Sequence, residues 1–247
     1  MAQLKQKLLG GALSAFGTRT IVHRVWALSP GIRCIRLFGP AIETLRWSPG
    51  DKVKLNIGGG LMRSYTPARV DRDEGFMDVV VHLHGNGPAS SWATNLKRGD
   101  EVLFAGPAPS MPRRHDETTP WVLFLGDETA LGLAQAMVQS CGPNTQVLGA
   151  IELSAHDAPA VDALDLLLQP VVREGAHGDA LVQWLANTWL PPDPGIIWLS
   201  GEADSVLRLR TALLERGVTR EQLCIKPYWS TRGAAHRKQL ERGALVA

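Results

Sequence analysis

Three short stretches of this sequence bring together residue types that could bind a flat, anionic ligand. In the first, Arg63-Ser64-Tyr65-Thr66, the tyrosine ring can lie against a planar group while Arg63 and Thr66 donate hydrogen bonds to anionic or carbonyl oxygens. A strand end with one packed tyrosine would have the same residue types. The stretch therefore becomes a candidate site only together with the other two.

The second stretch, His84-Gly85-Asn86-Gly87-Pro88-Ala89-Ser90-Ser91, is a glycine-rich turn that leads into a helix. We expect this helix over about residues 89–96, where free backbone N–H groups and the hydroxyls of Ser90 and Ser91 could hold a pyrophosphate. Gly87 would let the backbone approach that group closely. A capped helix after a tight turn is the alternative interpretation.

Two histidines, His82 and His84, lie two residues apart and therefore on one face of a strand. They could be metal ligands, but no nearby cysteine, aspartate or glutamate completes a ligand set. We therefore expect no metal site, and we expect both rings to pack beside a bound cofactor.

The third stretch has two parts, Gly126-Asp127-Glu128-Thr129 and Ser200-Gly201-Glu202, each of which follows an apolar strand. An open α/β sheet binds its ligands at the carboxyl ends of its strands, and glycines there permit close approach. The GxGxxG fingerprint of dinucleotide-binding proteins is absent. An acidic helix start, favoured by the helix dipole, is the alternative explanation for Asp127 and Glu128.

The elements that must position these stretches fall into two groups. We expect strands over residues 51–57, 77–84 and 101–105, and this short spacing predicts a small antiparallel β-barrel. Farther along the chain, strands and helices alternate, which predicts a parallel sheet covered on both faces. The expected strands there are residues 121–125, 146–153, 166–172, 196–200 and 222–226, and the expected helices are residues 128–139, 179–188 and 203–216.

The polar, proline-bearing stretch 111–120 separates the two groups and is interpreted as a linker. We predict a tail or short helix over residues 1–20, with an amphipathic stretch at 4–16, an antiparallel β-barrel domain over 21–118, and an α/β domain with a C-terminal segment over 119–247. A barrel followed by a parallel α/β domain suits enzymes that hold a flavin on the barrel and a nicotinamide on the parallel sheet.

Composition excludes several classes of protein. Of 247 residues, 45% are hydrophobic and 20% charged, which is typical of a globular chain. The net charge of +2 offers no broad field for nucleic acid, and the 3 cysteines are too far apart for a zinc ribbon or an iron–sulfur cluster. No apolar run approaches the ~20 residues that span a bilayer, and the N-terminal stretch lacks a clean signal-peptide cleavage site. We therefore expect a cytoplasmic protein with no integral membrane segment.

Over roughly residues 22–233, the motifs together resemble those of the siderophore-interacting proteins, flavin-dependent ferric-siderophore reductases of the ferredoxin-reductase superfamily. The family's motifs are RxYT, HGxxGPASxWA, GDETAL, a GE before a helix, and a YWRRG-like segment. This chain has Arg63 to Thr66, His84 to Ala93, Gly126 to Leu131, Gly201-Glu202, and Tyr228-Trp229-Ser230-Thr231-Arg232-Gly233 in the corresponding order.

The resemblance implies that FAD is bound and that NADH or NADPH is the electron donor. Electrons would pass through FAD to Fe(III) in a siderophore, which would release Fe(II), and no catalytic acid, base or nucleophile would be required. Lys54 and Arg232 would bind the anionic ferric siderophore. The implied cofactor-binding residues are Arg63, Ser64, Tyr65, Thr66, His82, His84, Gly87, Pro88, Ala89, Ser90, Ser91, Gly126, Asp127, Glu128, Thr129, Gly201, Glu202 and Trp229.

The sequence departs from the family pattern at three points. An arginine that often follows RxYT is displaced to Arg69, Ser230-Thr231 replaces part of the usual basic pair, and Gly132 stands where proline is common. Arg113 or Arg114 could add positive charge from the linker. Neither these departures nor the motifs identify the siderophore.

Both the electron donor and the reductase activity have alternative interpretations. Glu152, at the end of the second parallel strand, favours NADH because an acid there suits a free ribose hydroxyl, although Arg173 or Arg208 could fold into the site. A protein of the same fold could instead take electrons from a ferredoxin, or could bind flavin or siderophore without turnover. We expect a monomer and no nucleic-acid partner.

Overall fold

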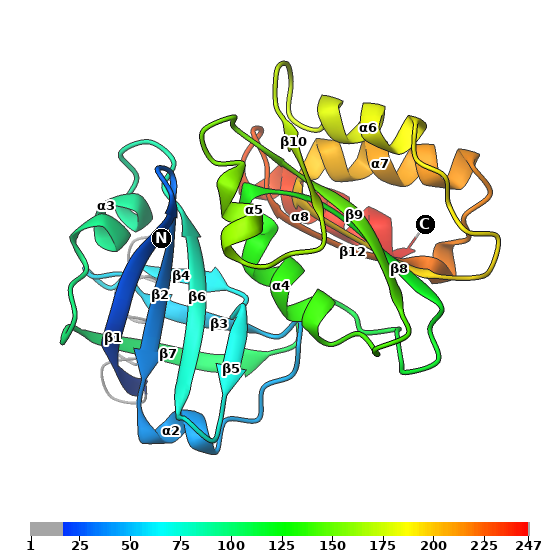
Figure 1. Ribbon diagram of the computed structural model, residues 1–247. Helices are drawn as coiled ribbons and strands as arrows, with labels where there is room; N and C mark the ends of the chain where they lie inside the picture. Colours follow the sequence, from blue (N-terminus) through cyan, green and yellow to red (C-terminus); the bar gives the residue numbers. More distant parts are fainter. Residues whose placement is uncertain (1–16, 247) are drawn as a thin grey trace. The chain divides into compact units, whose positions relative to one another are not determined.

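A computed structural model describes residues 17–246 and shows two compact units, which divide between Ser110 and Met111. Figure 1 shows an antiparallel sheet in the first unit and a parallel sheet with helices in the second. This architecture confirms the predicted fold class. The amphipathic stretch expected at residues 4–16 lies outside the described residues.

The first unit is a seven-stranded sheet in the order β4-β3-β7-β1-β2-β6-β5, with antiparallel neighbours. Its strands are β1 (Thr18–Ser29), β2 (Ile32–Phe38), β3 (Lys52–Asn56), β4 (Met62–Tyr65), β5 (Arg69–Asp71), β6 (Phe76–His82) and β7 (Glu101–Ala108), and its helices are α2 (Pro40–Glu43) and α3 (Pro88–Asn95). Strands β3, β6 and β7 confirm the three expected strands.

The core of this unit is formed by every second residue of its strands. Met77, Val79 and Val81 of β6 point inward and are buried together with Val53 and Leu55 of β3. Strand β1 was not expected from the sequence, because register irregularities, one of them between Val22 and Arg24, interrupt its alternation.

The second unit is a five-stranded parallel sheet in the order β10-β9-β8-β11-β12. Its strands are β8 (Trp121–Asp127), β9 (Gln146–Leu153), β10 (Gln169–Val172), β11 (Ile196–Glu202) and β12 (Leu223–Trp229). Its helices are η1 (Glu128–Ala130), α4 (Leu131–Gln139), α5 (Pro159–Ala163), α6 (Asp179–Ala186), α7 (Ala203–Glu215), η2 (Arg220–Gln222) and α8 (Ala234–Val246). The five expected strands and three expected helices are present, with ends that differ by a few residues.

The central strand β8 explains where a ligand can reach this sheet. Both of its faces are buried, and Leu123 and Leu125 pack against the apolar sides of α6 and α7, which Figure 1 shows on one face of the sheet. The strand order reverses between β8 and β11, so their carboxyl ends form the switch point at which open α/β sheets bind ligands. No helix in residues 17–246 is long and apolar enough to cross a membrane.

Candidate functional site

The start of helix α3 has an uncapped N-terminus behind a glycine turn. Gly87 is its N-cap, and no side chain within the described chain caps it with a hydrogen bond. Gly85, at φ +56, is in the left-handed region, and a Cβ added there would meet no described atom within 4 Å. Gly85 therefore borders open space, and the first backbone N–H groups of α3 have no partner inside the helix.

The hydroxyls of Ser90 and Ser91 differ in what they can do. Ser90 is buried, and its hydroxyl donates to the His84 carbonyl at 3.1 Å, so it shapes the turn. Ser91 is exposed, and its hydroxyl can reach a ligand. The rings of His82 and His84 lie 5.7 Å apart, and in residues 17–246 no group of three His, Cys, Asp or Glu could hold a metal ion.

Strand β4 orients the RxYT residues through its pairing with β3. Tyr65 pairs with Val53 and Arg63 with Leu55, so both side chains are on the core face, whereas Ser64 pairs with Lys54 on the opposite face. Burial raises the pKa of Tyr65 to about 12, against the opposing charge of Arg63, so the phenol stays protonated and can donate. Tyr65 and Ala89 of α3 pack against the same core cluster.

At the carboxyl edge of the parallel sheet, one buried carboxylate joins three strand ends. Asp127 accepts hydrogen bonds from the Thr129 backbone N–H at 2.9 Å, from the Glu202 backbone N–H at 2.8 Å and from the Trp229 indole N–H at 2.9 Å. The sequence-predicted residues Asp127, Thr129, Glu202 and Trp229 therefore do lie together.

The protonation of Asp127 is shifted by its surroundings. Burial raises the pKa of its carboxyl to about 6, and the nearby charge of Glu128 adds to the rise, while hydrogen bonds from Thr129 and Trp229 oppose it. The carboxyl thus titrates in a range where an exposed aspartate is fully ionised.

Glu202 and Trp229 are fixed by the same network. Glu202 caps α7 by accepting from the Ser205 backbone N–H at 2.9 Å, and it also accepts from the Thr231 backbone N–H at 3.2 Å. The Trp229 ring meets His177 edge-on, with 4.8 Å between ring centroids. These contacts set the orientation of the indole before any ligand is bound.

A second group of buried carboxylates lies beside the first. Arg173 donates to Glu152 at 2.8 Å and also to Glu128. Burial lowers the pKa of its guanidinium, but the hydrogen bonds and the negative charges of these two glutamates together raise it. Both oxygens of Glu152 accept from the Gly178 backbone N–H at 2.9 Å. Glu152 is buried within this network and so gives no support for NADH over NADPH. Arg173 donates to both glutamates, so it gives no support for NADPH either.

The glycines at this edge are required by the protein's own packing. Gly201 has φ +118, and a Cβ there would lie 2.5 Å from an Asp127 carboxylate oxygen. A Cβ on Gly126 would lie 3.0 Å from the Ser200 carbonyl oxygen.

The predicted substrate residues belong to different units. Lys54 is exposed on β3, and Arg232 is exposed beside Asp204, with a nitrogen-to-oxygen distance of 3.9 Å. Arg114 donates to the Glu221 carbonyl at 2.6 Å at the amino edge of the parallel sheet, the edge opposite Asp127. Arg69 pairs with Asp71 at 2.7 Å.

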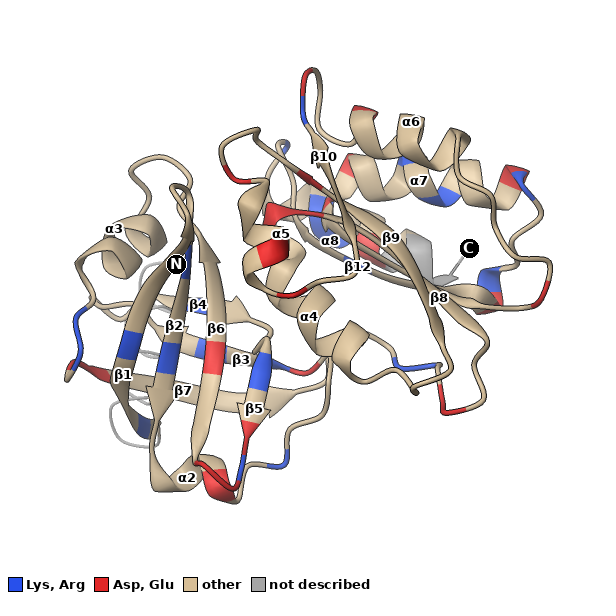
Figure 2. Ribbon diagram, viewed as in Figure 1, with Lys and Arg blue, Asp and Glu red and all other residues tan. Residues whose placement is uncertain are grey.

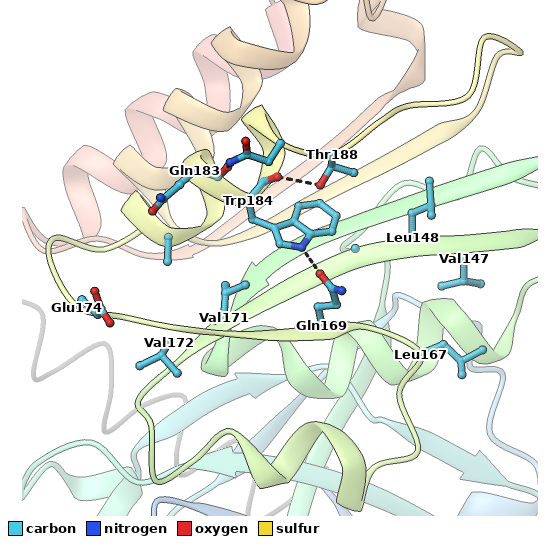
Figure 3. A pocket seen from close by; sticks show the side chains of 13 residues that line it. Val147, Leu148, Leu167, Gln169, Val171, Val172, Glu174, Gln183, Trp184 and Thr188 are labelled. Atoms are coloured by element: carbon cyan, nitrogen blue, oxygen red, sulfur yellow. Dashed lines mark hydrogen bonds between the residues drawn. The ribbon is translucent and has the colours of Figure 1, made fainter.

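A groove of about 880 Å³ lies between β9, β10 and α6 (Figure 3). Trp184 lies across it and donates its indole N–H to Gln169, while the Thr188 hydroxyl donates to the Trp184 carbonyl at 2.8 Å. None of the sequence-predicted site residues lines this groove, so it is separate from the candidate site.

Residues that sequence analysis missed complete the carboxyl edge. His177 supplies both the ring contact to Trp229 and a carbonyl that accepts from the Ser205 hydroxyl at 2.8 Å. Thr231 reaches Glu202 from the C-terminal segment. The only local signal for His177 was its place in the turn before α6, next to Gly178, whose φ is +85.

Two family models match successive parts of the chain. Residues 58–111 match the siderophore-interacting FAD-binding domain, and residues 119–232 match the model for siderophore-interacting protein. These ranges contain the RxYT strand, the α3 loop, the Asp127 edge and the C-terminal segment.

Curated relatives and solved structures agree with these matches. The NADPH-dependent ferric-chelate reductase of Escherichia coli is 25% identical over 173 residues, or 68% of this chain and 65% of that protein. An uncharacterized protein of Mycobacterium tuberculosis is 28% identical over 185 residues, and the match covers 68% of this chain and 64% of the relative. The chain thus spans less than two thirds of the length of these relatives.

Among solved structures, the siderophore-interacting protein SipS from Aeromonas hydrophila has a TM-score of 0.74 at 22% identity, covering 92% of this chain and 97% of that one. The ferredoxin reductase in carbazole 1,9a-dioxygenase has a TM-score of 0.69 at 22% identity, covering 85% of this chain and 69% of that one.

An antiparallel sheet followed by a five-stranded parallel α/β unit defines a protein of the ferredoxin-reductase-like fold. Within that fold, the matches over both units identify the family. The chain belongs to the siderophore-interacting protein family and carries its FAD-binding domain.

Proposed function

We propose that this protein is an FAD-dependent ferric-siderophore reductase that uses NADH or NADPH as electron donor and acts as a monomer. The observation that carries the proposal is the uncapped start of α3 behind an open glycine loop, inside the range that matches the FAD-binding domain. The ferric-chelate reductase activity named for the E. coli relative supports the same reaction class.

The residues of the first unit fit a flavin dinucleotide. The α3 N–H groups and the Ser91 hydroxyl would hold the pyrophosphate, and Arg63 would donate charged hydrogen bonds to an anionic oxygen. Tyr65 would lie against the ring system, and Thr66 would contribute its backbone and hydroxyl. When bound, FAD supplies the step from two-electron hydride chemistry to one-electron transfer.

The second unit would position the nicotinamide through backbone and ring surfaces. Asp127 and Glu202 use their carboxylates to hold strand ends together, so these side chains would shape the site without donating to the ligand. Gly126 and Gly201 would let the strand ends pack closely at the switch point, and the oriented Trp229 would provide a flat wall.

Lys54 and Arg232 would attract an anionic ferric siderophore and leave the chemistry to the cofactor. Hard oxygen ligands hold Fe(III) far more tightly than Fe(II), so reduction would itself release the metal. No side chain of the protein needs to bind the iron for this reaction.

An anaerobic titration of FAD-loaded protein with NADH and then NADPH tests the proposal. The visible absorption of oxidised flavin should bleach promptly, and adding a ferric siderophore with an Fe(II)-specific chromophoric chelator should restore it as the Fe(II) complex forms. If the flavin stays oxidised with both nicotinamides but bleaches with reduced ferredoxin, the electron donor is ferredoxin and not NADH or NADPH. Flavin that bleaches with neither would leave a binding protein without turnover.

A further inference from the structure

A row of four charged side chains crosses the outer face of the antiparallel sheet. Arg24 of β1 pairs directly with Arg36 of β2, Arg36 with Asp78 of β6, and Asp78 with Arg69 of β5. The row points away from the core, because the alternating neighbours of these residues, such as Val79, are buried inside. Figure 2 shows it as blue segments on β1, β2 and β5 with one red segment on β6.

Aromatic rings hold these guanidinium groups in place. Arg36 makes two hydrogen bonds of 2.7 Å to Asp78, and its guanidinium carbon lies 3.7 Å from the centre of the Phe76 ring. Arg24 lies 4.9 Å from the centre of the Trp26 ring, and Arg69 lies 5.1 Å from that of Phe76. The donors are therefore ordered before any partner arrives, which lowers the entropy cost of binding.

This arrangement is not explained by the stability of the sheet. Like charges directly opposite each other, as Arg24 and Arg36 are, destabilise an antiparallel pair. Within residues 17–246, Arg24 has no acidic partner, whereas Arg36 is paired with Asp78 and Arg69 with Asp71. A local conflict of this kind is expected where a surface serves a binding function.

An exposed apolar pair lies beside the row on the same strands. Ile21 of β1 pairs with Phe38 of β2, and their exposed fractions are 44% and 46%. The cores of protein interfaces are enriched in aromatic residues and arginine and depleted in lysine and acids. Exposed apolar side chains next to ordered arginines match that composition.

We propose that this face of β1, β2, β6 and β5, called here the arginine row face, is a docking surface for an acidic protein partner. A carboxylate of the partner would pair with Arg24, and an apolar side chain would cover Ile21 and Phe38. Nucleic acid fits less well because the chain has a net charge of only +2. The inference is independent of the reductase reaction, because the test below measures binding alone.

The probe is a short synthetic peptide in which glutamates flank a leucine and a phenylalanine, with a lysine-for-glutamate peptide as its counterpart. Binding is followed by fluorescence anisotropy at low and physiological salt. The acidic peptide should bind, more weakly as salt increases, and the lysine peptide should not. Oligothymidylate and phosphatidylserine-containing vesicles are assayed in parallel, and sedimentation reports self-association.

Three variants locate the binding. Arg24→Glu should weaken peptide binding about tenfold, and Phe38→Ser should weaken it less. Arg220→Glu is the matched control, because Arg220 is an exposed arginine of the other unit and the change in charge is the same; it should leave binding unchanged. The thermal midpoint of Arg24→Glu should not fall, because the change places a glutamate opposite Arg36.

Four results would overturn the proposal. The first is that the wild-type protein does not bind the acidic peptide, and the second is that Arg220→Glu weakens binding as much as Arg24→Glu. Oligothymidylate or vesicles could bind more tightly than the peptide in an Arg24-dependent manner, which would assign the face to another class of partner. Self-association abolished by Arg24→Glu would assign it to a second copy of this chain.

Discussion

The two candidate ligand-binding regions, one in each unit, use their polar groups in opposite ways. At the start of α3, N–H groups have no cap in the described chain, Gly85 borders open space and Ser91 is exposed. At the carboxyl edge of the parallel sheet, Asp127 and Glu202 are buried and bonded to the protein's own backbone.

This difference indicates how each half would meet a ligand. The α3 loop offers donors directly, so its ligand contributes the missing partners. The carboxyl edge has satisfied its acids internally, so a ligand there meets backbone and the Trp229 ring. Changes in the first region should therefore affect ligand binding more than folding, and changes in the second should affect folding first.

The largest effect is expected from removing the cation among the buried carboxylates. Arg173→Met would leave Glu128 and Glu152 without their guanidinium partner and should lower the free energy of unfolding by about 3 kcal/mol. Arg19→Met is the control, because Arg19 pairs with Glu101 at 3.5 Å on an exposed surface and should cost less than about 1 kcal/mol. Urea titration compares the two, and equal losses would show that the buried network contributes no special stability.

Two glycine substitutions compare the stability of the carboxyl edge with that of the α3 loop. Gly201→Ala should cost about 2 to 3 kcal/mol, because a Cβ there would collide with the Asp127 carboxylate at an unfavourable φ. Gly85→Ala should cost about 1 kcal/mol, because only the left-handed φ opposes it. FAD titration of the folded Gly85→Ala protein should show weakened binding; full FAD affinity would mean that the loop does not approach the cofactor.

The alternation of strands and helices was enough to predict the second unit from the sequence. Strand β9 was predicted with the observed ends, because its neighbours are clear turns and its residues are apolar. Strand β1 was missed because a register irregularity between Val22 and Arg24 breaks its period of two. Strand β10 begins later than expected, at Gln169, because Leu166 and Leu168 are buried without joining the sheet, while Leu167 between them is exposed.

Site residues were harder to predict than elements, because a motif does not show which way a side chain points. Asp127, Glu202 and Trp229 were predicted to lie in one site. No local pattern indicated that the two carboxylates would accept hydrogen bonds from the protein's own backbone N–H groups and from an indole. Glu152 looked like a ribose ligand because of its position at the end of a strand. Its burial depends on Gly178 and Arg173, which lie more than one element away.

A pH dependence should follow from Asp127. Its folded-state pKa of about 6 lies above the value of an unfolded aspartate, so the folded protein binds more protons between pH ~4 and ~6 and its stability falls as pH rises through that window. Asp127→Asn removes this titration, so its destabilisation relative to wild type should be about 2 kcal/mol smaller at pH 7 than at pH 4. Urea titrations at both values measure the difference, and a destabilisation that grows with pH would mean that the ionised carboxylate is favoured.

A smaller effect, on ligand binding alone, is expected at Arg63. Arg63→Ala should weaken FAD binding about tenfold by removing charged hydrogen bonds, with little loss of stability because Arg63 bonds only the adjacent Met62 carbonyl in the described chain. Isothermal titration of the apoprotein with FAD gives the affinity. The conservative Arg63→Lys variant should recover part of it, and undiminished binding in Arg63→Ala would remove this residue from the site.

The smallest effect is expected where charge alone attracts the substrate. Lys54 and Arg232 are exposed, and surface charges act through screened fields, so Lys54→Ala combined with Arg232→Ala should raise the apparent KM for an anionic ferric siderophore about threefold. The rate of flavin reduction by nicotinamide should not change, because neither residue belongs to the Asp127 network. Adding salt should reduce the difference between wild type and variant, and a KM that is unchanged at low salt would mean that the siderophore docks away from both residues.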